Sequence, residues 1–233
     1  MVDMKGKHIV ITGASGGMGT ILTKRLADMG AKLSLCSNDE ALLNNLLEEI
    51  KGKTEVFAKV IDITDEAQVE AFIEESFKAN GEFYGLLNLA GLSIPGQIPE
   101  TPVEAYDTMM DVNVKGTFLT SKHFAHHAEE PAVIINIGSM AAINANGNAP
   151  LYCTAKAAVN MLSKALLLQV GSKKIRVTTV NPGGADTAFW GDRKVDRTKL
   201  MNAEDVCDVI MFVLTSNPKI QIHEISFESM AKF

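Results

Sequence analysis

Tyr152 and Lys156 stand four residues apart in the segment YCTAK, inside a stretch whose apolar spacing predicts a helix over residues 151–170. Helical spacing of four places both side chains on one face. A phenol exchanges protons near neutral pH only if its pKa, about 10 in water, is lowered, and a neighbouring lysine cation favours the phenolate. Lowering the pKa by two to three units takes roughly 3–4 kcal/mol, more than an exposed pair supplies. The alternative without any chemistry is a half-buried aromatic side chain beside a solvated charge. The five residues of YCTAK alone do not distinguish the two interpretations.

A second candidate is the glycine-rich turn TGASGGMG at residues 12–19, which joins a short apolar run to a helical pattern. Glycines let the backbone approach a pyrophosphate, and a helix N-terminus offers free N–H groups and a positive dipole end. The dinucleotide fingerprint G-x-G-x-x-G does not fit, because Leu22 stands where its last glycine belongs. The pattern present, T-G-x-x-x-G-x-G, favours a phosphate site, and a tight turn without a ligand is the alternative.

Residue types that bind metals are present but are not grouped as ligands. His123 and His127 lie one helical turn apart in HFAHH, with no carboxylate or cysteine obviously placed to join them. Positively charged side chains near a helix C-terminus interact favourably with the helix dipole, so these histidines do not require a metal. Cys36, Cys153 and Cys207 lie far apart, and an odd number of cysteines fits reduced cytosolic thiols. We therefore expect no metal site and expect Cys153 to be a packing residue.

The bulk composition sets limits on the class of protein. The chain has 233 residues, 46% of them hydrophobic and 21% charged, which is ordinary for one globular domain with a large core. A net charge of −6 argues against nucleic acid or an anionic membrane as a partner. No apolar run approaches the length of a membrane span, and the N-terminus lacks a signal-peptide pattern. We expect a cytoplasmic protein in which residues 1–233 form one domain.

Short runs rich in β-branched residues alternate with helical patterns from end to end. Several runs are apolar on both faces, as are the strands of a parallel sheet covered by helices. The alternation predicts an α/β fold, a single doubly wound Rossmann-type domain whose mostly parallel seven-stranded sheet has helices on both faces. Strands are expected at residues 8–12, 32–36, 55–60, 85–90, 132–138, 175–180 and 220–227, and helices at 18–29, 39–51, 65–79, 102–128, 151–170 and 203–215.

Two local signals refine this picture. In TPVE, Thr101 is expected to be an N-cap, with Pro102 at the first helical position and Glu104 completing a capping box. Residues 184–201 form the longest stretch without clear periodicity, and loops of that length in a compact domain often bind ligands. We expect this stretch to be a substrate loop.

Several motifs together resemble those of the classical short-chain dehydrogenase/reductase family, over nearly the whole chain. Besides TGASGGMG they are NLAG at residues 88–91, Asn113, Ser139, YCTAK, and NPGGADT at residues 181–187. They occur in the family's order, and the interval from Ser139 to Tyr152 matches the family's usual spacing. The resemblance implies hydride transfer between a nicotinamide dinucleotide and a small carbonyl compound or its alcohol.

The resemblance also implies a catalytic set made of Asn113, Ser139, Tyr152 and Lys156. Tyr152 would supply or remove the hydroxyl proton, Lys156 would tune it and hold the nicotinamide ribose, and Ser139 would donate to the substrate oxygen as charge develops there. Asn113 would lie in a local helix distortion and hold a water that links Lys156 to solvent. A buried asparagine with satisfied hydrogen bonds is the alternative for Asn113.

In the same resemblance, the cofactor lies across the C-terminal ends of the strands. Asp62 would cap the adenine amino group beside Ile63, with a simple helix N-cap as an equal alternative for Asp62. Met18 would pack toward the nicotinamide, the Thr187 hydroxyl would bond the carboxamide, and residues 88–91 would touch a ribose. The implied cofactor residues are Gly13, Ser15, Gly17, Met18, Gly19, Ser37, Asn38, Asp62, Ile63, Asn88, Ala90, Gly91, Tyr152, Lys156, Pro182, Gly183 and Thr187.

The sequence encodes the choice between NAD and NADP poorly. NAD-preferring members of the family carry an acidic residue at the end of the second strand, where this chain has Cys36, followed by Ser37 and Asn38. NADP-preferring members often carry Arg or Lys there or at the position of Gly16, and neither is present. The missing acid removes a repulsion against a 2′-phosphate, and Ser37 and Asn38 can hydrogen-bond it, so NADP is favoured. NAD is the alternative if Asp39 serves a ribose.

The sequence does not identify the substrate. Met140, Phe189 and Trp190 are expected to line its site, and Trp190, the only tryptophan, is expected to fold over the site or into a subunit contact. The basic residues at 193–197 are interpreted as a solvated surface, with steering of an anionic substrate as the alternative.

The resemblance further implies a homodimer or homotetramer built by the helices that hold residues 113–127 and 152–169. Two other functions stay open at this point. A catalytically silent dinucleotide-binding regulator is disfavoured by the intact Asn–Ser–Tyr–Lys set. A 3-oxoacyl-thioester reductase is disfavoured because the chain end lacks the glycine-rich final strand of such reductases.

Overall fold

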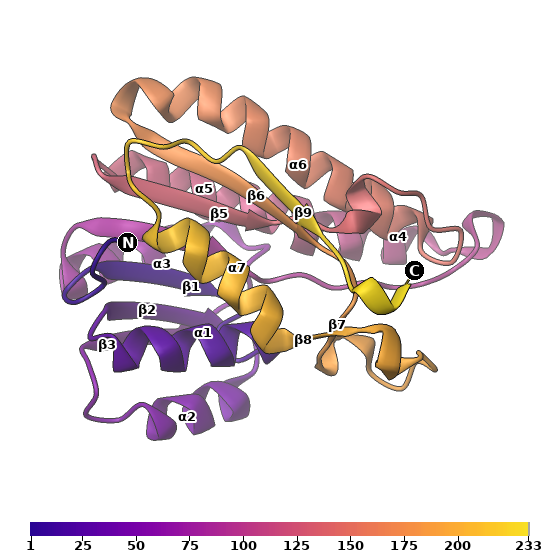
Figure 1. Ribbon diagram of the computed structural model, residues 1–233, viewed down its shortest axis with the longest axis horizontal. Coiled ribbons are helices and arrows are strands. Elements are labelled where there is room, and N and C mark those ends of the chain that lie inside the picture. Colours follow the sequence, from indigo (N-terminus) through magenta and orange to yellow (C-terminus); the bar gives the residue numbers. More distant parts are fainter. Residues whose placement is uncertain (233) are drawn as a thin grey trace.

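The computed structural model describes residues 1–232, and a seven-stranded sheet forms its centre (Figure 1). Every neighbouring pair of strands is parallel, in the order β3-β2-β1-β4-β5-β6-β9. The chain changes direction across the sheet between β1 and β4, which makes their carboxyl ends the expected place for a ligand. The strands are β1 (His8–Thr12), β2 (Lys32–Ser37), β3 (Val56–Val60), β4 (Phe83–Asn88), β5 (Ala132–Ile137), β6 (Ile175–Pro182) and β9 (Glu224–Phe227).

Helices cover both faces of the sheet, and the alternation of side chains along β1 shows how. Ile9 and Ile11 pack into the core formed with α1, α2 and α7, whereas Val10 packs into the core formed with α3, α5 and α6. The predicted doubly wound α/β domain is therefore confirmed. The helices are α1 (Gly17–Asp28), α2 (Glu40–Glu49), α3 (Glu66–Asn80), α4 (Val103–Met110), α5 (Gly116–His127), α6 (Pro150–Val170) and α7 (Ala203–Thr215).

The long helix predicted at residues 102–128 is interrupted in its middle. A π-helical turn at Asp111–Lys115 joins α4 to α5 without a loop. The capping box predicted at its start is wrong. Pro102 is the N-cap residue, and the Thr101 hydroxyl donates instead to the carbonyl of Gln97, in the preceding turn at Ile98–Glu100.

The last strand is shorter than predicted. Residues 220–227 were expected to be extended, but β9 begins only at Glu224. Before it, the side-chain amide of Gln221 donates to the carbonyl of Val177 at 2.6 Å and accepts from its N–H at 3.3 Å. A side chain thus takes the place of the backbone ladder along this part of β6.

The predicted substrate loop has little regular structure. Its ends pair as two short parallel strands, β7 (Ala185–Asp186) and β8 (Met201–Asn202). Figure 1 shows the C-terminal end of the chain beside this loop, and the turn at Met230–Lys232 contacts the turn at Arg197–Lys199. The remaining short helical turns are Met140–Ala142, Gly171–Lys173 and Ala188–Trp190.

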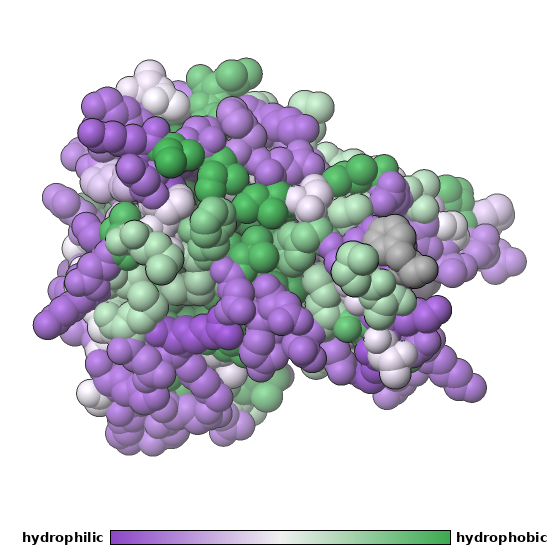
Figure 2. Space-filling model, in the orientation of Figure 1, coloured by the Kyte–Doolittle hydropathy of each residue, from purple (hydrophilic) through white to green (hydrophobic). Residues whose placement is uncertain are grey.

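The surface is mixed in character. Figure 2 shows hydrophilic residues around the edge of the view and a band of hydrophobic residues across its middle. Phe212 of α7 is 56% exposed. None of the helices described for residues 1–232 combines the length and apolarity needed to cross a membrane.

Candidate active site

The turn between β1 and α1 requires glycine at two positions. Gly13 has a φ of +62°, and a Cβ there would lie 2.9 Å from the backbone nitrogen of Ala90. A Cβ on Gly19 would overlap the carbonyl oxygen of Gly13. The Thr12 hydroxyl accepts from the N–H groups of Leu89 and Ala90, both at 3.2 Å, a contact that the sequence reasoning missed. These contacts bring the N-terminus of α1 against the end of β4.

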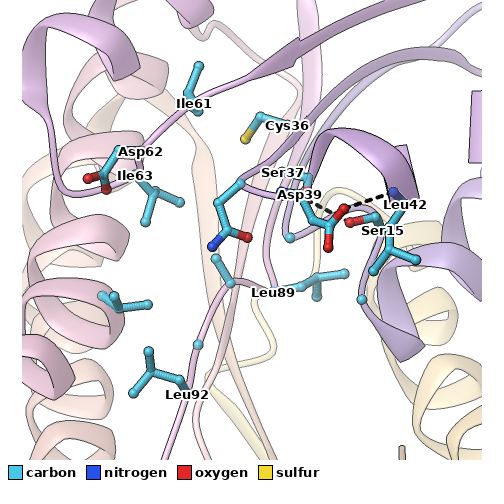
Figure 3. A pocket seen from close by; sticks show the side chains of 16 residues that line it. Ser15, Cys36, Ser37, Asp39, Leu42, Ile61, Asp62, Ile63, Leu89 and Leu92 are labelled. Carbon is cyan, nitrogen blue, oxygen red and sulfur yellow. Dashed lines mark hydrogen bonds between the residues drawn. The ribbon is translucent and has the colours of Figure 1, made fainter. Parts of the chain in front are cut away.

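A cleft of about 370 Å³ opens at the carboxyl ends of β1, β2 and β4 (Figure 3). Figure 3 shows Ser15 and Asp39 on one side of the cleft and Asp62 and Ile63 on the other. A cleft at the switch point of a parallel sheet, beside a glycine turn and a helix N-terminus, fits a dinucleotide. The predicted cofactor residues that line it are Gly13, Ser15, Ser37, Asn38, Asp62, Ile63, Ala90 and Gly91.

One corner of the cleft is formed where β2 meets α2. Strand β2 ends at Ser37 rather than at Cys36, whose thiol is buried and has its pKa raised by burial to about 12. The hydroxyl groups of Ser37 and Ser15 share a hydrogen bond of 2.6 Å. Asp39 caps α2, because its Oδ1 accepts from the N–H of Leu42 at 2.9 Å, and it also lines the cleft. The corner therefore offers two hydroxyls and one carboxylate.

The opposite wall contains Asp62, whose hydrogen bonds bear on its helix-cap alternative. Its Oδ1 accepts from the N–H and the hydroxyl of Thr64, at 2.8 and 2.7 Å. The N-cap of α3 is Asp65, which accepts from the N–H of Gln68. The helix-cap alternative for Asp62 is therefore wrong. Asp62 closes the turn after β3 and lines the cleft together with Ile63.

The side chain of Asn88, a residue expected to touch a ribose, lies in a buried hydrogen-bond network. Its Nδ2 donates to Ser121 at 3.1 Å and to Asn136 at 2.8 Å, while its Oδ1 accepts from Thr120 at 2.7 Å. Asn136 in turn donates to Ser163 of α6. The amide of Asn88 is thus fully used in a buried network that ties β4 to β5 and to α5, and it does not reach the cleft.

Other predicted cofactor residues also lie outside the cleft. Met18 packs its side chain against the core between α1 and α7, and its carbonyl accepts from the Cys207 thiol at 3.6 Å. A Cβ on Gly17 would lie 3.0 Å from the Cβ of Thr187, so the start of the substrate loop rests on the N-terminus of α1. Pro182 is buried at the end of β6, and Gly183 follows it.

The predicted catalytic residues meet where β5 ends beside α6. Lys156 donates from Nζ to the carbonyl of Ile137 at 2.8 Å, and this Nζ lies 5.7 Å from the centroid of the Tyr152 ring. Ser139 follows β5, and its N–H donates to Oδ1 of Asn181 at 3.0 Å. A Cβ on the preceding residue, Gly138, would overlap that same oxygen. Asn181 therefore positions Ser139, a role that no signal in the sequence revealed.

Burial shifts the pKa values of Tyr152 and Lys156 in a way that the sequence reasoning did not anticipate. Burial raises the pKa of Tyr152 to about 12, against the opposing effects of the Ser139 hydroxyl and the Arg193 charge. Burial also lowers the pKa of Lys156 to about 8. Desolvation dominates the pKa of Tyr152 in the described chain, and the expected tuning of Tyr152 by Lys156 stays a prediction. At neutral pH Tyr152 is a protonated phenol, able to donate.

Asn113 lies in the π-helical turn, as the family resemblance implies. Its Nδ2 donates to the carbonyls of Leu92 and Met109, both at 2.9 Å, but its buried Oδ1 has no partner in the described chain. A Cβ on Gly91 would lie 2.8 Å from this oxygen and 3.3 Å from the Nζ of Lys156. The alternative of a fully satisfied asparagine is wrong, and the free acceptor faces the same point as the ammonium.

A second pocket lies on the other side of Tyr152, with a volume of about 410 Å³. Met140, Phe189 and Trp190 line it together with Ser139. The rings of Tyr152 and Phe189 are 5.7 Å apart, and Trp190 donates from Nε1 to the carbonyl of Ala185 at 2.7 Å. Trp190 thus folds back onto its own loop at the edge of the pocket.

The same pocket is also lined by charged residues. Arg193 lines it, so the interpretation of this residue as solvated surface is wrong, whereas Arg197 is exposed and pairs with Asp186. Lys199 and the C-terminal residues Glu228 and Lys232 line it as well. Nothing in the local sequence places the C-terminus at this pocket, since only the parallel pairing of β9 with β6 brings it there.

The two histidines of HFAHH lie in different environments. His123 has its Nε2 3.5 Å from a carboxylate oxygen of Glu66, and His127 stacks on Phe77 with ring centroids 5.1 Å apart. Within residues 1–232, no three His, Cys, Asp or Glu side chains are grouped as a metal site would require. The Sγ of Cys153 accepts a hydrogen bond at 3.3 Å from the N–H of Asn146, seven residues earlier in the chain.

Comparison with known proteins assigns the chain to a family. The model of the short chain dehydrogenase family matches residues 7–198. An uncharacterized oxidoreductase of Staphylococcus saprophyticus is 30% identical over 230 residues, which cover 97% of this chain and 98% of that one. Two solved structures are similar throughout. A dehydrogenase/reductase from Sinorhizobium meliloti is 26% identical with a TM-score of 0.90, and the match covers 99% of this chain and 97% of that one. A short-chain dehydrogenase/reductase from Serratia marcescens is 25% identical with a TM-score of 0.91, and the match covers 97% of this chain and 98% of that one. The chain therefore belongs to the short-chain dehydrogenase/reductase family.

Proposed function

We propose that this protein is an NAD(P)-dependent oxidoreductase that interconverts a small carbonyl compound and its alcohol. The dinucleotide supplies or accepts the hydride when it is bound. The observation that carries the proposal is that Tyr152 and Ser139 border the second pocket, while Lys156 and the free oxygen of Asn113 meet at Gly91, in the wall of the first. One cleft fits the dinucleotide and the other fits the substrate, with the proton donor between them.

Each residue of this set has a separate role in the reaction. Tyr152, protonated at neutral pH, gives its proton to the oxygen of the substrate as the carbonyl is reduced. Ser139 donates to the same oxygen, where negative charge develops. Lys156, whose Nζ lies near Gly91, would offer N–H donors to a ribose hydroxyl of the dinucleotide, and its positive charge would favour the phenolate that Tyr152 becomes after donating. Asn113 offers an acceptor beside Lys156.

Replacing Tyr152 tests the proposal. The purified protein is screened against aldehydes, ketones and alcohols while the absorbance of the reduced cofactor is followed with both NADH and NADPH. Tyr152→Phe is expected to lower kcat by at least about a thousandfold, because general acid catalysis is lost, with little change in dinucleotide binding. Tyr106→Phe, at an exposed tyrosine of α4, is the matched control. Full activity of Tyr152→Phe would refute the assignment, and dinucleotide binding without turnover of any compound would favour a regulator.

We infer that NADP is preferred over NAD, but only weakly. Ser15, Ser37 and Asn38 offer neutral hydrogen-bond donors to a 2′-phosphate at the end of β2. Asp39 lines the same corner and repels that phosphate, and no Lys or Arg lines the cleft among the described residues. The kcat/KM for NADPH is therefore expected to exceed that for NADH by less than about tenfold, or ~1.4 kcal/mol. A ratio below one would refute the preference.

We also propose that the protein works in the cytoplasm as a homodimer or homotetramer. Its three cysteines are free thiols. Phe118 of α5 and Met161 and Leu168 of α6 are exposed apolar side chains on the two helices implied to form a subunit contact. Light scattering after size-exclusion chromatography is expected to give two or four times the mass of 25.1 kDa. A monomer at micromolar concentration would contradict this proposal.

A further inference from the structure

The second pocket carries a positive charge, although the whole chain has a net charge of −6. Arg193, Lys199 and Lys232 line it, and Glu228 is the one acidic residue among its described lining residues. Glu228 is already paired, since its Oε2 lies 2.6 Å from the Nζ of Lys232. Arg193 and Lys199 are therefore the cations whose charge is left for a ligand.

Neighbouring acids on the loop do not neutralise these two cations within the pocket. Asp186 is paired with Arg197. Asp196 caps the turn at Arg197–Lys199, accepting from the N–H of Thr198 at 3.1 Å and from its hydroxyl at 2.6 Å. The hydrogen bonds from Thr198 and, to a smaller extent, the charge of Lys199 lower the pKa of Asp196, and Asp196 does not line the pocket. Within residues 1–232, no ion pair joins Arg193 or Lys199 to a carboxylate.

Arg193 is held in a fixed orientation at the pocket wall. Its Nε donates to the carbonyl of Trp190 at 2.8 Å, and its Nη2 donates to the carbonyl of Phe189. The guanidinium carbon lies 4.9 Å from the Phe189 ring centroid and 5.1 Å from the Trp190 ring centroid. These contacts use one edge of the guanidinium. Its Nη1 has no protein partner in the described chain, so a second edge is free for a planar anion.

The position of Arg193 relative to Tyr152 fits a single small substrate. The Phe189 ring is near both, since its centroid lies 5.7 Å from that of the Tyr152 ring and 4.9 Å from the guanidinium carbon of Arg193. The guanidinium is therefore within about 11 Å of the Tyr152 ring, close to one Debye length at 0.1 M salt. Burial raises the pKa of Tyr152, and the charge of Arg193 opposes this rise.

We propose that the substrate of this pocket is an oxo acid, or the corresponding hydroxy acid, whose carboxylate binds the free edge of Arg193. Its carbonyl lies at Tyr152 and Ser139, and Lys199 adds a second positive charge at the mouth of the pocket. The carboxylate is separated from the carbonyl by several carbon atoms, which pack along Phe189. This inference rests on the proposed function, because it assigns a substrate class to the same active site.

The test compares oxo acids with their uncharged methyl esters. Oxo acids of four to eight carbon atoms, with the carbonyl at each position, and the matching esters are assayed with the full-length protein and saturating reduced cofactor. The best acid is expected to have a kcat/KM at least tenfold above that of its ester, a preference that shrinks as salt rises from 0.05 to 0.5 M. Arg193→Gln is expected to lower kcat/KM for the acid 10- to 100-fold, mainly through KM, and to leave the ester within threefold.

Two further variants separate charge from folding. Lys194→Gln, at an exposed neighbour that does not line the pocket, is expected to leave both substrates unchanged. Arg193→Lys keeps the charge but not the planar edge, and is expected to retain part of the acid preference. Esters reduced as well as acids, or an acid preference that survives in Arg193→Gln, would overturn the oxo-acid inference and leave the proposed function standing. No turnover of either set, when another compound of the wider carbonyl and alcohol screen is turned over, would overturn the oxo-acid inference alone; no turnover in that screen as well would overturn both.

Discussion

Replacing Lys156 with methionine is expected to stabilise the fold while it removes activity. Lys156 is 5% exposed, and burial lowers its pKa from 10.5 to about 8. At 1.36 kcal/mol per pKa unit, the folded state disfavours the charged lysine by roughly 3 kcal/mol below pH 8. Its hydrogen bond to the carbonyl of Ile137 returns about 1 kcal/mol. The free energy of unfolding of Lys156→Met is therefore expected to rise by about 2 kcal/mol at pH 7, or a Tm about 4–8 °C higher.

The pH dependence of this effect has a definite sign. Below pH 8 the lysine is charged in both states, so the full penalty is present. Between pH 8 and 10.5 the folded protein loses the proton while the unfolded chain keeps it, and the wild type therefore gains stability as pH rises. The advantage of Lys156→Met is expected to fall from about 2 kcal/mol at pH 7 toward zero near pH 9.5.

Thermal and denaturant unfolding without added dinucleotide, at pH 7.0 and 9.5, measure the difference. Lys173→Met, at an exposed lysine just after α6, is the matched control and is expected to change the free energy of unfolding by less than about 0.5 kcal/mol. A Lys156→Met protein that is less stable than the wild type at pH 7, or equally more stable at both pH values, would refute the burial argument.

Three more predictions follow from the first cleft. Gly13→Ala is expected to lower the dinucleotide affinity by at least tenfold and to lower the Tm, because the added Cβ would meet the backbone of Ala90. The control Gly147→Ala, whose Cβ would lie in open space, is expected to change neither quantity. Asn88→Ala is expected to lower the free energy of unfolding by about 2–3 kcal/mol in a urea titration, with dinucleotide affinity unchanged within about threefold; a large loss of affinity would restore its predicted binding role. Asp39→Asn is expected to raise the NADPH/NADH ratio of kcat/KM by about tenfold, and an unchanged ratio would show that Asp39 does not face the 2′ position.

The sequence was sufficient for the fold because its signals are local and repeated. Strands such as β1 are apolar on both faces, and only a sheet covered on both sides satisfies that pattern. The errors occur where one side chain redirects the backbone. Gln221 replaces a strand ladder, and Thr101 bonds backward to Gln97 instead of forward into α4. Both are choices between hydrogen bonds of similar energy, which periodicity does not encode.

The candidate site was predictable where a motif fixes a backbone position, and less so where tertiary packing decides. Gly13 is required by its φ and its contact with Ala90, so its motif carries the prediction. Asn88 belongs to a motif too, but its three amide partners come from β5 and α5, and only the folded structure shows that they use up its hydrogen bonds. Arg193 belongs to none of the sequence motifs, so only the folded structure places it at the second pocket.

The polar groups that meet at Gly91 separate an enzyme from a regulator that merely binds a dinucleotide. Such a regulator needs the cleft beside Gly13 and can use the Lys156 ammonium to hold a ribose, but it does not need a buried oxygen without a partner. Lys156 and Asn113 supply these two groups, and each lowers the stability of the folded chain. Both face the same point beside Gly91, next to a phenol that is protonated at neutral pH. Dinucleotide binding alone gives no reason for a free acceptor and a protonated phenol at the wall between two pockets, whereas a site for proton transfer does.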